Sequence, residues 1–491
     1  MNSVGWFTLS GHWTRRHRTG AAVGFMGSCA VAAAAAMPAL QPRNSPVKSW
    51  HWPVVDVLVQ SGRFPIILST LGTIVSVLGW LLFAPPYARS PWRVLALWTF
   101  PVAVTLPVLS MDAYNYADYA WIAASGYPAN ETGLATLRSP TASVVDQWVG
   151  LPSPYPPLHT FIAEGAAGLT GFAPVWSALA MRLPSLVGLL LISWCVPKIA
   201  DEFDIDVGWA QWGVCLSPLT ILHGVGGAHS EMWALALGLP ALLAGARGRM
   251  VVGSVLAGAA LAIRPTAVVI MVAVAIAALR GVSGRGRIGA RLAASLVIAS
   301  LSSVAVSAIT HLGWGWLKQL GGQTQGPSLS PSRVFAELFG LIGPFAQVFG
   351  EEKLKTLGCI LIFAGALGAL VVRRDLWRGR PLRLVSYLAV AATLASPYLQ
   401  PWYFLPCLAL LAVSQGDLLS RSLIVGLTVL VSVPPINPGF PPWIFGPTAL
   451  VSAVQAAGLL RVTRASWLPS LCNAAPRCGE IGASARAENR Q

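Results

Sequence analysis

The residues best suited to chemistry gather in residues 109–157, where a very apolar chain becomes acidic and aromatic. Asp112 directly follows an apolar run, and an ionisable group at a membrane face is a candidate functional group. If a helix end places this carboxylate and limits its hydration, it can act as a general base that takes a proton from a hydroxyl. The alternative is that Asp112 only marks the water boundary or caps a short helix.

Aromatic and polar residues accompany Asp112 in this stretch. Tyr116 belongs to a series of aromatic residues that could stack on a sugar ring, although an aromatic belt at the membrane interface explains the series equally well. Asp146 and Tyr155 close the stretch. His159 and Glu164 follow at the start of the next apolar run, five residues apart, which is not a metal-ligand spacing.

Two further polar groups lie in the motif HGVGGAHSE. His229 and Glu231 follow Gly226 and Gly227, a glycine pair that lets the backbone turn tightly. The two side chains could be metal ligands, but no third ligand with zincin-like spacing is present, so the sequence predicts no metal site. The alternative is that they hydrogen-bond a ligand hydroxyl. A divalent ion is not indicated, and no other cofactor is predicted.

Arg264 interrupts an apolar run in the motif LAIRPTA. Because a guanidinium costs about 2.5 to 3.5 kcal/mol at mid-membrane, it must lie near the surface or have an anionic partner. A lipid-linked phosphate would satisfy it through two hydrogen bonds, and snorkelling to lipid headgroups is the alternative. Glycine motifs of the P-loop or dinucleotide kind are absent, which favours a lipid donor over a soluble nucleotide. Gln400 and Tyr403 form a last polar segment, SPYLQPWYFLP.

The composition identifies the kind of protein that must position these residues. Of 491 residues, 55% are hydrophobic and only 10% are charged, whereas soluble domains carry about 25% charged residues. The chain is therefore predicted to be an integral membrane protein. Its formal charge of +15 comes from short basic clusters between apolar runs, which is the positive-inside pattern rather than a nucleic-acid surface. The seven cysteines indicate no disulfide framework.

The apolar runs predict an all-α polytopic protein with about 14 transmembrane helices. Of the two runs 157–169 and 179–196, one is expected to enter the membrane without crossing, because the charge pattern requires an odd number of crossings there. Asp112, His229, Arg264 and Gln400 then share the outer face. The predicted organisation is a cytoplasmic N-terminus (1–19), a transmembrane domain (20–460) with outer loops at 110–157 and 310–349, and a basic cytoplasmic tail (461–491).

Four stretches give the chain a resemblance to a known family. They read SMDAYNYADYAWIAASGYPA, VVDQWVGLPSPYPPL, SPLTILHGVGGAHSE and LAIRPTA. With the hydropathy pattern, they make the chain similar to the actinobacterial polyprenol-phosphate-mannose-dependent α-1,6-mannosyltransferases, which are multispanning enzymes of the GT-C class. The family commonly has GGAHND where this chain has GGAHSE, PYGPL where it has PYPPL, and Lys in place of Arg264. These departures leave the acceptor open.

The resemblance implies a GT-C bundle in the cell membrane with an extracytoplasmic active site. The implied reaction moves mannose from a β-linked polyprenyl phosphate to an α-1,6-mannan glycolipid, such as a lipomannan or lipoarabinomannan core. Inversion needs one base, which would be Asp112, while Arg264 would balance the leaving phosphate. The remaining candidates would bind sugar or phosphate: His229, Glu231, Tyr155, Gln400, Tyr116, Asp146, His159 and Tyr403.

Two other functions fit the residues. A transferase of the same class could use another lipid-linked sugar, such as arabinose. A transporter of lipid-linked saccharides is the second alternative, but such proteins often show inverted repeats and a charged site near the midplane. The sequence contains no convincing repeat and no midplane carboxylate pair, which favours catalysis.

Overall fold

We describe the fold from a computed structural model of the chain. It describes residues 13–41, 45–49, 56–60, 63–85, 91–133, 137, 139–140, 151–319, 330–340, 343–414 and 418–432. Within these ranges every regular element is a helix, in agreement with the predicted all-α class. The predicted basic tail 461–491 and the apolar run 444–460 lie outside the described residues.

Helices succeed one another along the described part of the chain. The α-helices are α1 (Arg15–Ala35), α2 (Asp56–Gln60), α3 (Arg63–Leu82), α4 (Trp92–Val104), α5 (Asp112–Ala124), α6 (Pro157–Gly168), α7 (Pro174–Ala180), α8 (Arg182–Glu202), α9 (Val207–Val214), α10 (Glu231–Ala246), α11 (Met250–Leu261), α12 (Val268–Ala277), α13 (Arg285–Thr310), α14 (Trp316–Gln319), α15 (Pro331–Gly340), α16 (Gly343–Val372), α17 (Pro381–Ala395), α18 (Leu405–Ser414) and α19 (Leu418–Ser432). The tighter or wider helices are the 3₁₀ helices η1 (Pro38–Leu40), η2 (Pro46–Ser49), η5 (Pro265–Ala267), η7 (Arg374–Leu376) and η8 (Pro401–Phe404), and the π-helix η4 (Leu219–Gly226).

Within the described ranges, four helical segments are long and apolar enough to cross a membrane: Arg63–Leu82, Pro174–Glu202, Arg285–Thr310 and Lys353–Val372. Seven shorter apolar helices of 10 to 17 residues accompany them. Of the two runs predicted to include one that does not cross, 179–196 lies in the long segment Pro174–Glu202. The other run forms α6, whose 12 residues span about 18 Å and are too short for a hydrocarbon core of roughly 30 Å. The total of 14 stays a prediction.

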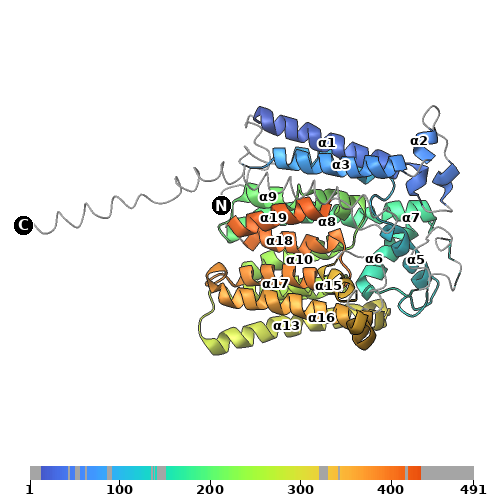
Figure 1. The fold of residues 1–491 in the computed structure, drawn as a ribbon. Helices are drawn as coiled ribbons and strands as arrows, with labels where there is room; N and C mark the ends of the chain where they lie inside the picture. Colours follow the sequence, from blue (N-terminus) through green and yellow to red (C-terminus); the bar gives the residue numbers. More distant parts are fainter. Residues whose placement is uncertain are drawn as a thin grey trace, which may run out of the picture.

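The helices form a bundle in which α1 and α3 lie side by side at one edge and α13, packed on α11, lies at the opposite edge (Figure 1). α1 and α3 pack closely because both carry glycine at the contact: a Cβ on Gly79 would collide with the backbone of Gly24. Trp80 of α3 stacks on Trp212 of α9 at 3.9 Å, and each indole donates to the other's backbone carbonyl. These contacts join the outer pair to the centre.

The centre of the bundle is the segment that carries HGVGGAHSE. Residues 212–236, which include η4 and the start of α10, are all buried. α10 packs against α8, α11 and α12, while α5, α6 and α7 gather at one end of the bundle (Figure 1). The polar residues of the motif therefore lie inside the bundle, close to the first residue of α5.

Candidate functional site

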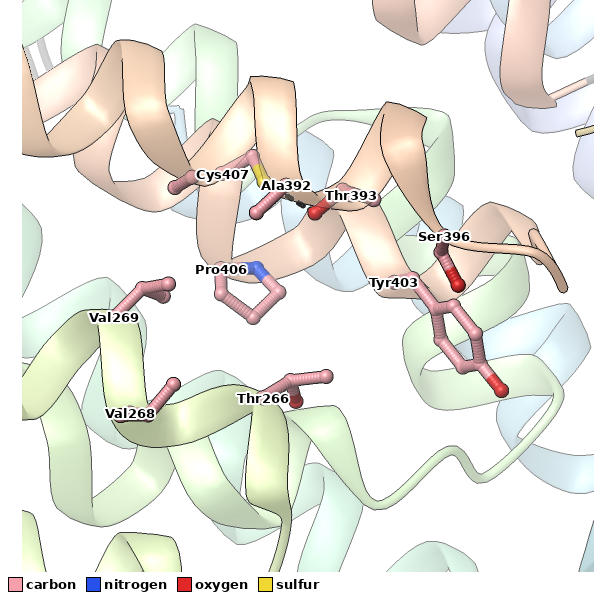
Figure 2. A pocket seen from close by; sticks show the side chains of 10 residues that line it. Thr266, Val268, Val269, Ala392, Thr393, Ser396, Tyr403, Pro406 and Cys407 are labelled. Carbon is pink, nitrogen blue, oxygen red and sulfur yellow. Dashed lines mark hydrogen bonds between the residues drawn. The ribbon is translucent and has the colours of Figure 1, made fainter. Parts of the chain in front are cut away.

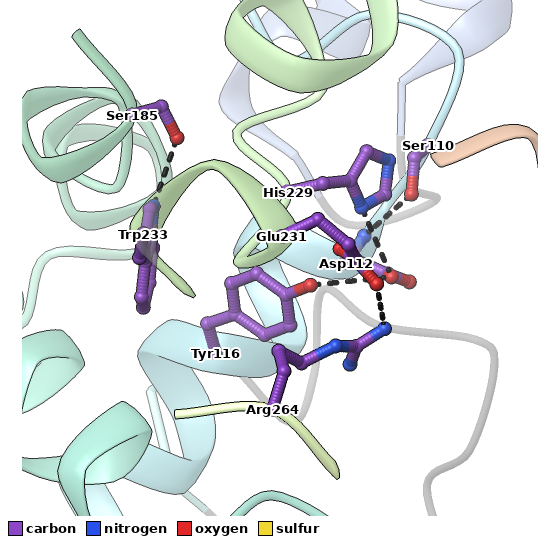
Figure 3. Close-up of polar contacts among 8 residues, drawn as sticks. All are labelled: Ser110, Asp112, Tyr116, Ser185, His229, Glu231, Trp233 and Arg264. Atoms are coloured by element: carbon purple, nitrogen blue, oxygen red, sulfur yellow. Dashed lines mark hydrogen bonds and ion pairs between the residues drawn. The ribbon is translucent and has the colours of Figure 1, made fainter. Parts of the chain in front are cut away.

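Asp112 is the first residue of α5, where a carboxylate also interacts favourably with the helix dipole. Its backbone N–H donates to Ser110 Oγ at 3.1 Å. One carboxylate oxygen, Oδ2, accepts a hydrogen bond from the Tyr116 hydroxyl at 3.4 Å and lies 3.4 Å from His229 Nδ1. The side chain is 19% exposed, and Oδ1 has no hydrogen-bond partner in the described part of the chain (Figure 3). One oxygen is therefore held while the other is available to a substrate.

His229 is fixed from two sides. Its ring is fully buried and stacks on Trp402 of η8, with 3.5 Å between ring centroids and 14° between planes. The opposite edge points at Asp112 (Figure 3). His229 lies three residues after the end of the π-helix η4, a rare element that frequently marks functional sites. His229 Nδ1 is therefore within ion-pair distance of the Asp112 carboxylate, although neither ring nitrogen makes a hydrogen bond within the described residues.

The backbone before His229 turns in a way that corrects one detail of the sequence interpretation. The positive φ of the turn, +56°, falls on Ala228 and not on either glycine. Gly227 is needed for another reason: a Cβ there would lie 2.7 Å from the carbonyl oxygen of His223 and 2.8 Å from the His229 ring. Glycine therefore lets the imidazole fold closely onto its own backbone.

Arg264 is ion-paired with Glu231, and the two side chains are 7% and 0% exposed (Figure 3). The guanidinium also lies over the Tyr155 ring at 5.1 Å and the Tyr403 ring at 5.5 Å. Arg264 therefore meets the energetic requirement through an anionic partner in the chain and does not extend to lipid headgroups. Glu231 is therefore committed to this pair, whereas Asp112 has no cationic arginine or lysine partner among the described residues.

Aromatic rings form the wall behind this pair. His159 stacks between Tyr155, at 4.1 Å, and Trp233, at 5.0 Å, and Tyr116 meets its ring edge-on at 4.6 Å. His159 is fully buried, and neither ring nitrogen has a hydrogen-bond partner among the described residues. The geometry gives His159 a packing role beneath Tyr155.

The other predicted residues are placed as follows. Gln400 is 6% exposed and directly precedes η8, the helix that supplies Tyr403. Asp146 lies outside the described residues. The structure thus brings together predicted residues from α5, the turn before α10, the segment before η5, and η8. Trp402 was not predicted, although it lies between two predicted residues in the motif QPWYF.

A cavity of about 220 Å³ lies between α12, α17 and α18 (Figure 2). Tyr403, which covers one face of the guanidinium, also lines this cavity. The remaining lining is small and aliphatic for the most part: Thr266, Val268, Val269, Ala389, Ala392, Thr393, Ser396, Pro406 and Cys407. Tyr403 therefore separates this largely aliphatic space from the buried guanidinium of Arg264.

Metal ligands are not clustered in the part of the chain that the structure describes: no group of three or more His, Cys, Asp or Glu residues there could hold a metal ion. The site as described is built from two carboxylates, one guanidinium, imidazoles and aromatic rings.

Comparison with known proteins identifies the family. The N-terminal domain of alpha-(1->6)-mannopyranosyltransferases matches residues 21–280, which include Asp112, Glu231 and Arg264 but not η8. Alpha-(1->6)-mannopyranosyltransferase A of Corynebacterium glutamicum is 24% identical over 70% of this chain and 74% of its own length. A probable alpha-(1->6)-mannopyranosyltransferase of Mycolicibacterium smegmatis is 29% identical over 82% and 81%, and alpha-(1->6)-mannopyranosyltransferase A of Mycobacterium tuberculosis is 28% identical over 69% and 67%. No solved structure matches. With a matched domain that covers more than half of its residues, the chain belongs to the alpha-(1->6)-mannopyranosyltransferase family and is a glycosyltransferase.

Proposed function

We propose that the enzyme transfers mannose from polyprenyl-phosphate mannose to the α-1,6-mannan of a lipomannan or lipoarabinomannan core. The observation that carries this proposal is that one site holds a partly exposed carboxylate, Asp112, and a buried cation, Arg264, and that the Tyr403 ring beside this cation also lines a largely aliphatic cavity. This arrangement suits a substrate that joins a sugar, a phosphate and an apolar chain.

The reaction is a single displacement at the anomeric carbon. Asp112 takes the proton of the acceptor hydroxyl through its free oxygen, the acceptor oxygen bonds to the sugar, and the bond between sugar and phosphate breaks. Polyprenyl phosphate leaves with one additional negative charge, which Arg264 offsets. A phosphate leaving group needs this electrostatic help more than it needs a proton, so one carboxylate suffices.

His229 and Tyr116 orient the base, because both contact the same oxygen of Asp112. The rings of Tyr155 and Tyr403 both contact the guanidinium, at 5.1 and 5.5 Å. With Glu231 buried against Arg264, the phosphate approaches a cation whose position is already fixed. Such pre-organised charge is effective because little reorganisation is needed during the reaction.

The cavity that Tyr403 lines supports a lipid donor. Sites that enclose a whole drug-sized ligand measure about 300 to 1,000 Å³, so 220 Å³ suits only a short part of a long chain. Thr266, two residues after Arg264, lines the cavity, and Tyr403 lines it while covering the guanidinium. A lipid phosphate can place its head at the cation and its first apolar units in this space, which a soluble nucleotide sugar lacks the chain to use.

The proposed setting is a GT-C bundle of about 14 crossings in the cell membrane, with the active site outside. The support is the charge pattern of the sequence, which puts the basic clusters inside and the segments of Asp112 and Arg264 outside. Cysteine accessibility mapping tests it: labelling of positions next to 112 and 264 from opposite sides would refute a shared outer site.

The catalytic test uses Asp112→Asn and Asp112→Ala in membranes that lack any other mannan-elongating transferase, with labelled polyprenyl-phosphate mannose as donor. Loss of a general base lowers turnover by about 10²- to 10⁴-fold. Glu131→Gln is the matched control, because Glu131 is an exposed acid in the same outer segment and its variant should keep full activity. Undiminished turnover of both Asp112 variants at equal protein levels would exclude Asp112 as the base.

Two arms of this assay address the alternatives. A labelled polyprenyl-phosphate arabinose donor tests the sugar, and its preferential use would overturn the assignment of mannose while keeping the base. Turnover by detergent-solubilised protein, with no compartments present, tests catalysis against transport. Linkage analysis of the product identifies the acceptor position.

A further inference from the structure

Arg182, the first residue of α8, is an arginine that the reaction described above does not use. Its side chain is only 2% exposed, and no carboxylate lies within ion-pair distance among the described residues. Its guanidinium instead donates to backbone carbonyls: Nη1 to Thr105, Nη2 to Leu106 at 2.6 Å, and both Nη2 (2.9 Å) and Nε (3.3 Å) to Gly226. A buried charge is costly unless such partners compensate it.

The three carbonyls belong to the ends of two helices. Thr105 is the C-cap residue of α4, and Gly226 is the last residue of η4. The C-terminal end of a helix carries a partial negative charge of about half an elementary charge, so two such ends can offset one guanidinium. This explains how the cation is tolerated without a carboxylate.

Each of these helix ends leads directly to a residue of the site. The segment after α4 runs through Val108 to Asp112, and the segment after η4 runs to His229. The two segments also touch each other, because the Val108 N–H donates to the Gly226 carbonyl at 3.2 Å. Arg182 thus joins the backbones from which the acid and the imidazole project.

We propose that Arg182 is a positioning residue that sets the contact between Asp112 and His229. The inference rests on the proposed role of Asp112 as the base. Arg182 touches neither sugar nor phosphate; it acts by holding the C-terminal ends of α4 and η4 together. None of the hydrogen bonds of Arg182 reaches the segment of Arg264, which forms the donor-binding side.

The experiment is a double-mutant cycle on transfer kinetics with Arg182→Met and His229→Ala. Because misplacement by about 1 Å can cost on the order of 10²-fold in rate, Arg182→Met should lower kcat by roughly 10- to 100-fold and leave the KM for the donor unchanged. In the His229→Ala background, where the contact is already lost, the same change should cost less than about twofold, since coupled residues are not additive. Equal losses in both backgrounds would overturn the proposal and leave a general structural role.

Two further variants separate positioning from folding. Arg182→Lys keeps the cation but offers fewer directed donors, and should recover part of the lost kcat; no recovery would count against the proposal. Arg247→Met is the matched control, because it removes an exposed arginine that pairs with Glu202 at the other end of α8, and kcat should be unchanged.

Hydrogen exchange measured by mass spectrometry needs no activity and keeps the inference distinct from the proposed function. Amides of residues 105–111 and 226–230 should exchange faster in Arg182→Met, while those of α11 stay protected. Unchanged protection in both segments would refute the proposal that Arg182 holds the ends of α4 and η4 together, even if mannose transfer is confirmed. Faster exchange in an enzyme that does not transfer mannose would refute the proposed function and leave this role of Arg182 intact.

Discussion

The buried pair of Glu231 and Arg264 gives the sharpest quantitative prediction. Glu231→Gln removes the carboxylate and leaves a guanidinium that is 7% exposed without its anion. Arg264→Gln leaves a fully buried carboxylate instead. Breaking a buried ion pair by removing one partner costs about 3 to 5 kcal/mol, because the remaining charge stays desolvated and uncompensated.

The surroundings decide where each variant falls in that range. The rings of Tyr155 and Tyr403 remain over the guanidinium in Glu231→Gln, at 5.1 and 5.5 Å, and each such contact contributes about 0.5 to 2 kcal/mol. We therefore expect Glu231→Gln to cost about 3 kcal/mol and Arg264→Gln, which loses both ring contacts, about 5 kcal/mol. The double variant buries no charge and should lie within about 2 kcal/mol of the wild type.

The assay is the free energy of unfolding in mixed micelles, measured by titration with sodium dodecyl sulfate and followed by circular dichroism. Glu202→Gln is the matched control: Glu202 pairs with Arg247 at 2.7 Å, but the side chains are 27% and 45% exposed, so the loss should be at most about 1 kcal/mol. Polyprenyl phosphate, added at a fixed concentration, should stabilise Glu231→Gln more than the wild type, because its phosphate can replace the missing carboxylate.

Two results would refute the expected coupling of Glu231 and Arg264, and a third would refute the phosphate contact. A cost below about 1 kcal/mol for Glu231→Gln would show that the pair behaves like an exposed one. A double variant that loses the sum of both single losses would show that the two charges do not depend on each other. Equal stabilisation of variant and wild type by polyprenyl phosphate would argue against a phosphate contact at Arg264.

Three further predictions concern residues around the base. Neither carboxylate oxygen of fully buried Asp118 has a hydrogen-bond partner among the described residues, and burial raises the pKa of this group to about 7. In the unfolded chain the Asp118 carboxyl loses its proton near pH 4, so the free energy of unfolding should fall by up to about 4 kcal/mol as the pH rises from 4 to 7. Asp118→Asn should reduce this pH dependence when unfolding is measured from pH 5 to 8. An unchanged pH dependence would show that other groups cause it. Gly227→Ala should lower kcat by about 10-fold or more because its methyl would meet the His229 ring, whereas Gly165→Ala, with nothing within 4 Å, is the control. Trp402→Ala should lower kcat by releasing the stacked imidazole while Trp402→Phe keeps most of the activity; equal activity of both variants in the transfer assay would show that stacking is not needed.

Local properties of the chain were sufficient to predict that the protein is helical and lies in a membrane. Helices were predictable because backbone groups in hydrocarbon must be hydrogen-bonded within their own segment, so apolar runs have little choice of structure. The motifs around Asp112, His229 and Arg264 indicated the family that the comparison identifies. The same local reasoning missed Arg182, although a lone arginine in the apolar run 179–196 is a signal of the same kind as Arg264.

The site itself was predictable only in part. Because a guanidinium in the membrane interior is costly, Arg264 was expected either to lie near the surface or to have an anionic partner. The structure shows that it has such a partner, Glu231. Its identity did not follow, because Glu231 lies 33 positions earlier in the chain and several carboxylates were available. His159 and Tyr155 were predicted to bind substrate, and their stacking is set by packing that no spacing rule describes.

The sequence by itself determined that this is a helical, basic, membrane-type glycosyltransferase with an acid at the start of a helix. Composition, hydropathy and short motifs each depend on residues that are close together in the sequence, so they can be recognised without knowledge of the fold. Only the tertiary structure decided that Asp112 meets His229, that Glu231 is committed to Arg264 and that Trp402 supports the imidazole. These contacts join residues up to 173 positions apart in the chain, and their distances depend on how the helices pack against one another.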